Sequence, residues 1–168
     1  MRNLCLVLIV GLLFVNVAGA QQTASAPPTM SEEDLTSLAL FGRPLPGTPL
    51  TMFHVNSRTV GILFQPPLMY SMRALANQST IFYVRGTTGE ETNINPAFII
   101  EVQDIGRVRG ETTSLHNLED GTYPAGTFID GIVEFQTKFP LIYQFTIHNG
   151  LNSVRVQYSP AAVDALDR

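Results

Sequence analysis

Apolar and polar residues alternate along much of the chain after residue 50, and this two-residue period predicts β-strands. Turn-forming Pro, Gly, Asn and Asp residues separate the alternating stretches. The stretches that fit the pattern are 51–55, 59–64, 68–75, 80–85, 97–103, 106–112, 127–137, 141–148 and 153–159. After Gly42 no stretch keeps a helical period over three turns, apart from a short tail at 161–166.

The pair Asn149-Gly150 lies between two alternating stretches and predicts a tight hairpin, because both residues accept the positive φ of a type I′ turn. A two-residue loop at this position pairs His148 with Leu151 and sets every later pair. The apolar face then pairs Phe145 with Val154, Tyr143 with Val156 and Leu141 with Tyr158. The polar face pairs Thr146 with Ser153, Gln144 with Arg155 and Ile142 with Gln157. A shift by one residue would mix the two faces, so the turn and the burial pattern agree.

The stretch 127–137 also separates its side chains by face. Ile129, Val133 and Phe135 share one side, which we expect to be buried. The other side carries Asp130, Ile132 and Glu134 and is expected to face solvent. Such one-sided alternation is typical of two packed antiparallel sheets or of a sheet closed on itself. The sequence therefore predicts an all-β fold, an antiparallel β-sandwich of immunoglobulin-like general shape, with a small closed β-barrel as the alternative.

One short N-terminal helix is predicted ahead of the strands. Ser31 is a suitable N-cap, the acids at 32–34 suit the positive end of a helix, and Gly42 is a suitable stop. Three prolines between Arg43 and Leu50 then predict an extended connection.

The first twenty residues have the pattern of a secretory signal peptide. Arg2 gives a positive start, residues 4–17 are almost all apolar, and residues 18–20 form a small-residue cleavage site. Cleavage near Ala20 starts the mature chain at Gln21 and predicts a secreted or periplasmic location. The polar, Pro-containing residues 21–30 predict a flexible leader, and 31–168 is expected to be a single β-sandwich domain.

Composition excludes several classes of site and partner. Cys5 is the only cysteine and precedes the cleavage site, so the mature chain has no thiol for a disulfide, a metal or nucleophilic catalysis. The formal net charge is −4 and Lys138 is the only lysine, so we expect no nucleic-acid partner. The apolar run at 4–17 is shorter than the roughly 20 residues of a membrane span. We therefore expect no stable membrane insertion.

Catalytic motifs are missing from the sequence, which predicts no catalytic residue, no metal ligand and no cofactor. His54, His116 and His148 are far apart and lack the spacing of metal ligands. A hydrolase or lyase of unfamiliar type, built from His54 or His116 with a loop carboxylate, is the alternative function. It needs a concave pocket in which a histidine meets an acid.

Two arginines are the first candidates for ligand binding. Arg107 and Arg109 are separated by one residue in an expected strand, so their side chains project from the same face. They form either structural ion pairs with Glu101 and Asp104 or a pair of guanidinium groups for an anion.

Further ligand-binding candidates lie in one expected loop. Glu119 and Asp120 precede a glycine and form either a simple turn or a weak Ca²⁺ site. Tyr123 is the tyrosine expected at the surface, where its ring could contact a ligand. Asn77 begins an Asn-Gln-Ser sequence, which is a glycosylation acceptor if the protein is eukaryotic.

These observations favour a secreted or periplasmic binding or assembly module that is not catalytic. Its partner is expected to be a protein or a small ligand, contacted by loops on a rigid β scaffold or through an added strand at a sheet edge. The alternatives are the hydrolase or lyase and a small-ligand-binding β-barrel with a continuous apolar cavity.

Overall fold

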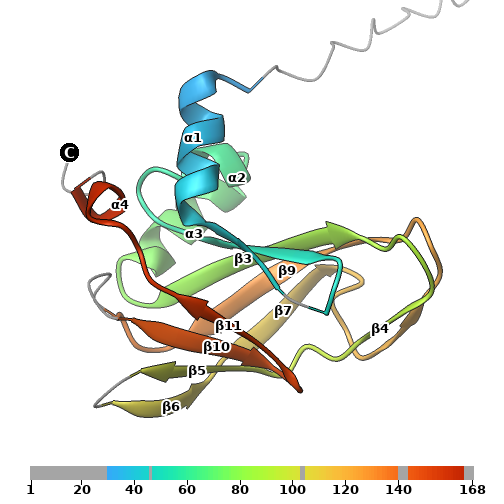
Figure 1. Cartoon of the computed structure of the whole chain (residues 1–168). Coiled ribbons are helices and arrows are strands. Elements are labelled where there is room, and N and C mark those ends of the chain that lie inside the picture. Colours follow the sequence, from blue (N-terminus) through green and yellow to red (C-terminus); the bar gives the residue numbers. More distant parts are fainter. Residues whose placement is uncertain (1–29, 46, 103–104, 140–143, 165–168) are drawn as a thin grey trace, which may run out of the picture.

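The computed structural model describes residues 30–45, 47–102, 105–139 and 144–164. Within these ranges the chain is mostly β with a few helices, and its sheets are all antiparallel (Figure 1). In chain order the elements are α1 (Glu32–Phe41), β1 (Gly42–Pro44), β2 (Leu50–His54), α2 (Val60–Leu63), α3 (Leu68–Ala76), β3 (Thr80–Thr87), β4 (Thr92–Ile94), β5 (Phe98–Val102), β6 (Gly106–Arg109), β7 (Glu111–His116), β8 (Gly121–Tyr123), β9 (Phe128–Phe135), β10 (Phe145–Asn149), β11 (Asn152–Val156) and α4 (Pro160–Asp164).

The strands of the described residues form three separate sheets. The five-stranded sheet has the order β1-β2-β3-β9-β7, and the four-stranded sheet has the order β11-β10-β5-β6. β4 and β8 form a two-stranded sheet at one end of the molecule (Figure 1). None of these sheets closes on itself within the described residues, so the closed-barrel alternative is wrong.

The main hydrophobic core lies between the five-stranded and the four-stranded sheet. One buried cluster takes side chains from one face of each sheet. The five-stranded sheet contributes Met52, Phe82, Val84, Val133 and Phe135, and the four-stranded sheet contributes Phe98, Ile100, Phe145, Ile147 and Val156. These are alternate residues of their strands, so the period that predicted the strands also selects the residues that fill this core.

A second buried cluster lies on the opposite face of the five-stranded sheet, beneath α2 and α3. Met72 of α3 packs there against Ile81, Tyr83 and Ile132. The predicted strands 59–64 and 68–75 are therefore wrong, because both segments are helical. Residues of high helix propensity (Leu, Met, Arg and Ala) dominate α3, and its apolar residues cover a sheet face. Ile132, expected at the surface, is 6% exposed.

The predicted N-terminal helix is confirmed as α1. The Ser31 hydroxyl accepts from the Asp34 amide at 3.1 Å, and the Asp34 carboxylate accepts from the Ser31 amide at 3.3 Å. This reciprocal capping satisfies two amides at the start of the helix. The helix ends at Phe41, whose side chain enters the main core. No helix among the described residues is long and apolar enough to cross a membrane.

The hairpin of β10 and β11 has the predicted faces but a different register. Phe145 pairs with Val156 and Thr146 with Arg155, two residues away from the predicted partners. The loop is Gly150-Leu151, and Gly150 has φ +60°, which fits a type II′ turn with glycine in its first central position. The Asn149 side chain instead accepts from the Ala97 amide at 3.1 Å. The predicted pairs of residues 141–143 lie outside the described residues.

Candidate functional site

The outward face of the four-stranded sheet carries three arginines. The strand register places Arg107, Glu101, Thr146 and Arg155 in one row across β6, β5, β10 and β11. The next row consists of Arg109, Ile99, His148 and Ser153. We call these two rows the arginine face. Strands lie about 4.8 Å apart, so Arg107 and Arg155, on the two edge strands of this sheet, begin about 14 Å from each other on the same face.

Glu101 is the acidic residue of the arginine face. Its carboxylate accepts a hydrogen bond from Arg107 Nε at 2.9 Å, and His148 Nε2 lies 3.4 Å away without forming a hydrogen bond. The hydrogen bond and the charge of Arg107 hold the pKa of Glu101 below its usual value. The structural ion pair expected for Arg107 is thus present with Glu101. The second expected acid, Asp104, lies outside the described residues.

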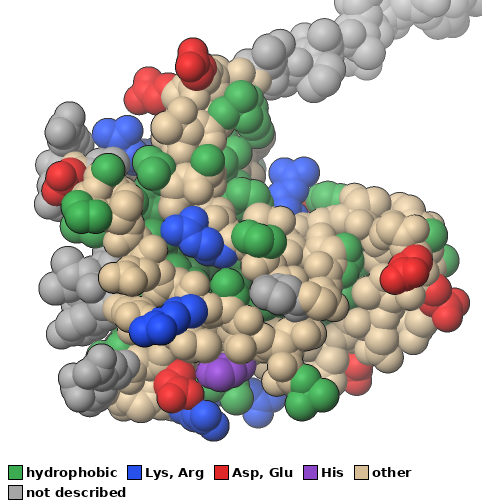
Figure 2. Space-filling view, in the orientation of Figure 1, with side chains coloured by type: hydrophobic (Ala, Val, Ile, Leu, Met, Phe, Trp, Pro, Cys, Tyr) green, Lys and Arg blue, Asp and Glu red, His purple; other side chains and the backbone are tan. Residues whose placement is uncertain are grey.

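Arg109 and Arg155 form no ion pair with any described residue, and both side chains are exposed. Figure 2 shows blue, basic side chains spread over the face that includes β11. Red, acidic side chains gather at the end of the molecule that carries β4. The protein is acidic as a whole, so three arginines beside one carboxylate make this face locally cationic.

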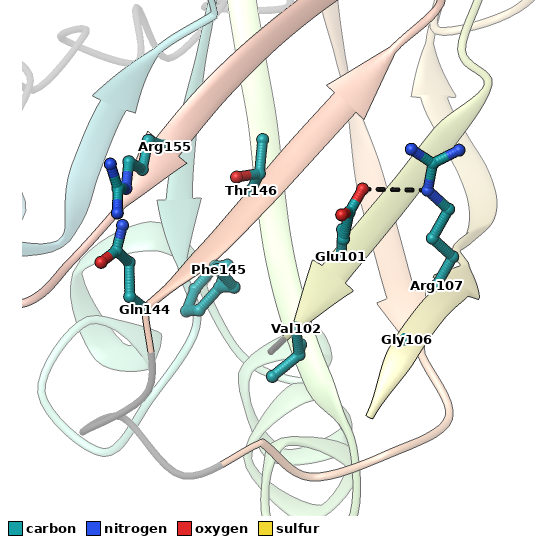
Figure 3. A pocket seen from close by; sticks show the side chains of 8 residues that line it. All are labelled: Glu101, Val102, Gly106, Arg107, Gln144, Phe145, Thr146 and Arg155. Atoms are coloured by element: carbon teal, nitrogen blue, oxygen red, sulfur yellow. Dashed lines mark hydrogen bonds and ion pairs between the residues drawn. The ribbon is translucent and has the colours of Figure 1, made fainter. Parts of the chain in front are cut away.

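A hollow of about 540 Å³ opens at one end of the arginine face (Figure 3). It is lined by Glu101, Val102, Gly106, Arg107, Gln144, Phe145, Thr146 and Arg155. Figure 3 shows Arg155 and Gln144 together on one side, the Glu101–Arg107 pair on the other, and Thr146 between them. Guanidinium, amide and hydroxyl groups are all hydrogen-bond donors, so the hollow can accept a carboxylate, phosphate or sulfate group.

The loop candidates lie elsewhere, at the β4–β8 end. Glu119 and Asp120 are exposed, and Tyr123 pairs with Thr92 at the edge of this small sheet. The Tyr123 ring is half-buried against the main core, and its hydroxyl donates to the Glu119 carbonyl oxygen at 3.3 Å. Tyr123 is thus less available for stacking than expected. No three metal-ligating side chains come together among the described residues.

His116 contacts the carboxylate of Asp130. Its Nδ1 lies 2.7 Å from an oxygen of Asp130, and the other oxygen of Asp130 accepts from the Tyr83 hydroxyl at 2.5 Å. The Asp130 side chain is 7% exposed and that of His116 is 67% exposed. Burial and the hydrogen bond to Asp130 raise the pKa of Tyr83. A buried carboxylate that holds a histidine through Nδ1 can orient the exposed Nε2 for proton transfer.

His54 has the opposite environment. It is 2% exposed, and neither ring nitrogen has a hydrogen-bond partner among the described residues. The ring stacks on Phe82 and Tyr158, with centroids 5.2 and 5.5 Å away. Burial, with a smaller contribution from the charge of Lys138, lowers the pKa of His54 to about 3. His54 is therefore neutral and enclosed, which does not suit the catalytic role that the alternative function would give it.

Sequence reasoning found Arg107, Arg109 and the acidic partner Glu101 but missed Arg155 and His148 as members of the same face. The alternation already placed Arg155 on the polar side of its hairpin. What it lacked was the order of strands, because β6 and β11 come together only through β5 and β10. Comparison with protein-family models, with curated proteins and with solved structures found no match.

Proposed function

We propose that this protein is a secreted or periplasmic binding module without catalytic activity, and that the arginine face binds an anionic group of its ligand or partner. The signal-peptide pattern of residues 1–20 supports the location. The proposed mature protein is one β-sandwich domain of immunoglobulin-like general shape at 31–168, after a flexible leader at 21–30. Two antiparallel sheets that share a core support this shape.

One observation carries the proposal. Arg107, Arg109 and Arg155 extend from the exposed face of a rigid sheet, and Glu101 is the acid placed among them. Guanidinium groups are planar, always charged and able to make paired hydrogen bonds, so they bind carboxylate and phosphate groups better than lysines do. A hydrogen bond to a charged group contributes about 1.5–3 kcal/mol, so several weak contacts together give a measurable affinity.

The experiment is an NMR titration of the ¹⁵N-labelled protein with inorganic phosphate and, separately, with a hexaglutamate peptide. We expect chemical-shift changes at the backbone and side-chain N–H groups of the three arginines. Arg109→Gln and Arg155→Gln should each weaken binding about tenfold, because one charge-assisted hydrogen bond is lost.

Arg85→Gln is the matched control, because Arg85 is exposed on the five-stranded sheet and lies outside the arginine face. It should leave both affinities unchanged. Absence of any shift at the arginine face, or equal weakening by Arg85→Gln, would refute the proposal.

The alternative function, a secreted hydrolase or lyase, is supported by the contact of His116 with Asp130. The same contact also has a structural explanation, because it links the edge strand β7 to β9 next to the β-bulge between Ser114 and His116. The larger hollows lined by described residues do not include His116. We therefore favour binding. Hydrolysis of an ester or amide that is lost in His116→Ala would reverse this preference.

A further inference from the structure

The open edge of β6 is the place where the arginine face can take a partner. β6 is the last strand of the four-stranded sheet (Figure 1). We propose that an extended segment of another protein, with alternating acidic and apolar residues, adds to this edge as an antiparallel fifth strand. This inference rests on the proposed function, since it names the partner that the arginine face would bind.

The backbone of β6 is oriented for this addition. The Gly110 amide donates to the Phe98 carbonyl oxygen at 2.9 Å, so this opposed pair is a hydrogen-bonded one. Hydrogen-bonded and non-hydrogen-bonded pairs alternate along antiparallel strands. The backbone N–H and C=O groups of Val108 therefore hydrogen-bond to β5, whereas those of Arg107 and Arg109 point away from β5. These groups form an unpaired edge of the kind that accepts another strand.

The side chains of β6 specify the charge pattern of the partner. Arg107 and Arg109 are two residues apart on one face, a separation of about 7 Å along the strand. A paired strand has the same period, so acids at alternate positions would lie opposite both arginines. Val108, on the other face, is half-buried against the main core. The residue between two acids of the partner would lie beside Val108, and an apolar side chain suits that position.

Space is present at both ends of β6. The hollow of the arginine face reaches Gly106 and Arg107, and a second hollow of about 540 Å³ is lined by Pro96, Arg109, Gly110, Glu111 and Thr112. Glu111 would repel an acid, so the added strand should end beside Arg109. The pairing segment is thus short and matches Gly106–Arg109.

A second copy of this chain is the wrong occupant of the edge. Antiparallel pairing of two β6 strands would bring the arginines of one copy against those of the other, and like charges opposite each other are destabilising. The same arginines protect the edge from pairing with uncharged strands. The edge therefore selects an acidic strand through charge and accepts it through backbone hydrogen bonds.

The experiment uses the protein as the expressing cell processes it and two synthetic peptides of about eight residues. In both peptides Glu and Val alternate, with capped ends. The second peptide is N-methylated at each Glu, which keeps its charge but removes the N–H groups that would face Arg107 and Arg109. Affinities are measured by NMR titration, and amide hydrogen exchange is followed at Arg107 and Arg109.

We expect the first peptide to bind at least tenfold more tightly than the N-methylated one and to slow exchange at both amides. Arg109→Gln should lower the affinity for the first peptide about tenfold, whereas Arg73→Gln, on α3, should leave this affinity unchanged. Equal binding of the two peptides would overturn strand addition and leave anion binding by the arginine face intact. If inorganic phosphate binds but neither peptide does, strand addition is likewise overturned and anion binding by the arginine face remains. Failure of both peptides and of phosphate would overturn the proposed function as well.

Discussion

At the scale of single residues, His54 is the least expected feature of the molecule. An alternating stretch predicts half of its residues to be buried, and His54 takes such a position in β2. Its ring joins Phe41 of α1, Phe82 of β3 and Tyr158 of the C-terminal segment. A charged imidazolium in this cluster would lack both solvent and a hydrogen-bonding partner, so the folded protein holds His54 neutral.

This environment predicts a loss of stability in acid. The pKa of His54 is about 3 in the folded protein, against 6.5 for an ordinary histidine. Between these values the unfolded chain binds a proton that the folded chain does not. The contribution of His54 is therefore complete above pH 6.5 and is lost as the pH falls towards 3, by about 1.4 kcal/mol per pH unit. Urea unfolding at pH 7, 6, 5 and 4 measures this slope.

His54→Phe should reduce the slope, because phenylalanine fits an aromatic cluster and does not titrate. His148→Gln is the control, since it removes a half-buried histidine of the arginine face and keeps His54. We expect His148→Gln to retain most of the wild-type acid slope. An unchanged slope in His54→Phe would contradict the burial of a neutral imidazole.

Side-chain direction was the most predictable property at this scale. Arg107 and Arg109 share a face as their spacing requires, and Phe145 is buried as its hairpin pattern requires. Tyr123 was less predictable, because a loop tyrosine is free only if no other element packs on it. Contact between Tyr123 and the main core depends on residues distant in sequence.

At the scale of elements, close approach of backbones fixes some residues. Gly86 of β3 is opposite Leu50 of β2. A Cβ at position 86 would lie 2.2 Å from the Pro49 carbonyl oxygen, closer than any real contact. Gly86→Ala must therefore push β2 away from β3, and we expect a loss of about 2 kcal/mol in the free energy of unfolding.

Gly89 provides the matched control for this prediction. It lies in the same part of the chain and does not have a positive φ, and a Cβ at position 89 would meet no heavy atom within 4 Å. Gly89→Ala should therefore change stability by less than about 0.5 kcal/mol. Denaturant unfolding of both variants measures the difference, and equal effects would refute the close approach at Gly86.

The helices α2 and α3 were the main error at the element scale. Their sequences contain short apolar runs, which period alone cannot assign to a strand or to a helix. The element on which such a run packs decides between strand and helix. Here Met72 and Phe64 are buried in one cluster on a face of the five-stranded sheet, together with Ile81, Tyr83 and Ile132. The hairpin register also depends on a distant contact. Asn149 accepts a hydrogen bond from the Ala97 amide and pairs within the sheet, and the turn is formed by Gly150 and Leu151 instead of Asn149 and Gly150.

At the scale of the whole molecule, β3 connects the two buried clusters. Ile81 and Tyr83 belong to the cluster beneath α2 and α3, whereas Phe82 and Val84 belong to the main core. The five-stranded sheet is thus a central layer with apolar side chains packed on both faces. Because one strand serves both clusters, we expect the described domain to unfold in one cooperative step.

Met72→Ala tests this cooperativity. Met72 is 8% exposed in the second buried cluster, beneath α2 and α3, and its truncation should lower the free energy of unfolding by about 2–3 kcal/mol. Far-ultraviolet circular dichroism and tyrosine fluorescence should report the same shifted midpoint, with the slope against denaturant unchanged. Earlier loss of the helical signal, with the sheets intact, would show that the two clusters unfold separately.

The sequence by itself determined the local features of this protein: the N-terminal helix with its Ser31 cap, most of the strands, and which residues of those predicted strands share a face. These follow from short-range periodicity and capping chemistry, which are written in neighbouring residues. The tertiary structure decided which strands are neighbours. It brought Arg155 into one face with Arg107, placed α2 and α3 over Ile132, and joined His116 to Asp130. Such contacts depend on long-range packing, because many pairings satisfy the same local pattern and only burial of the whole chain selects one of them.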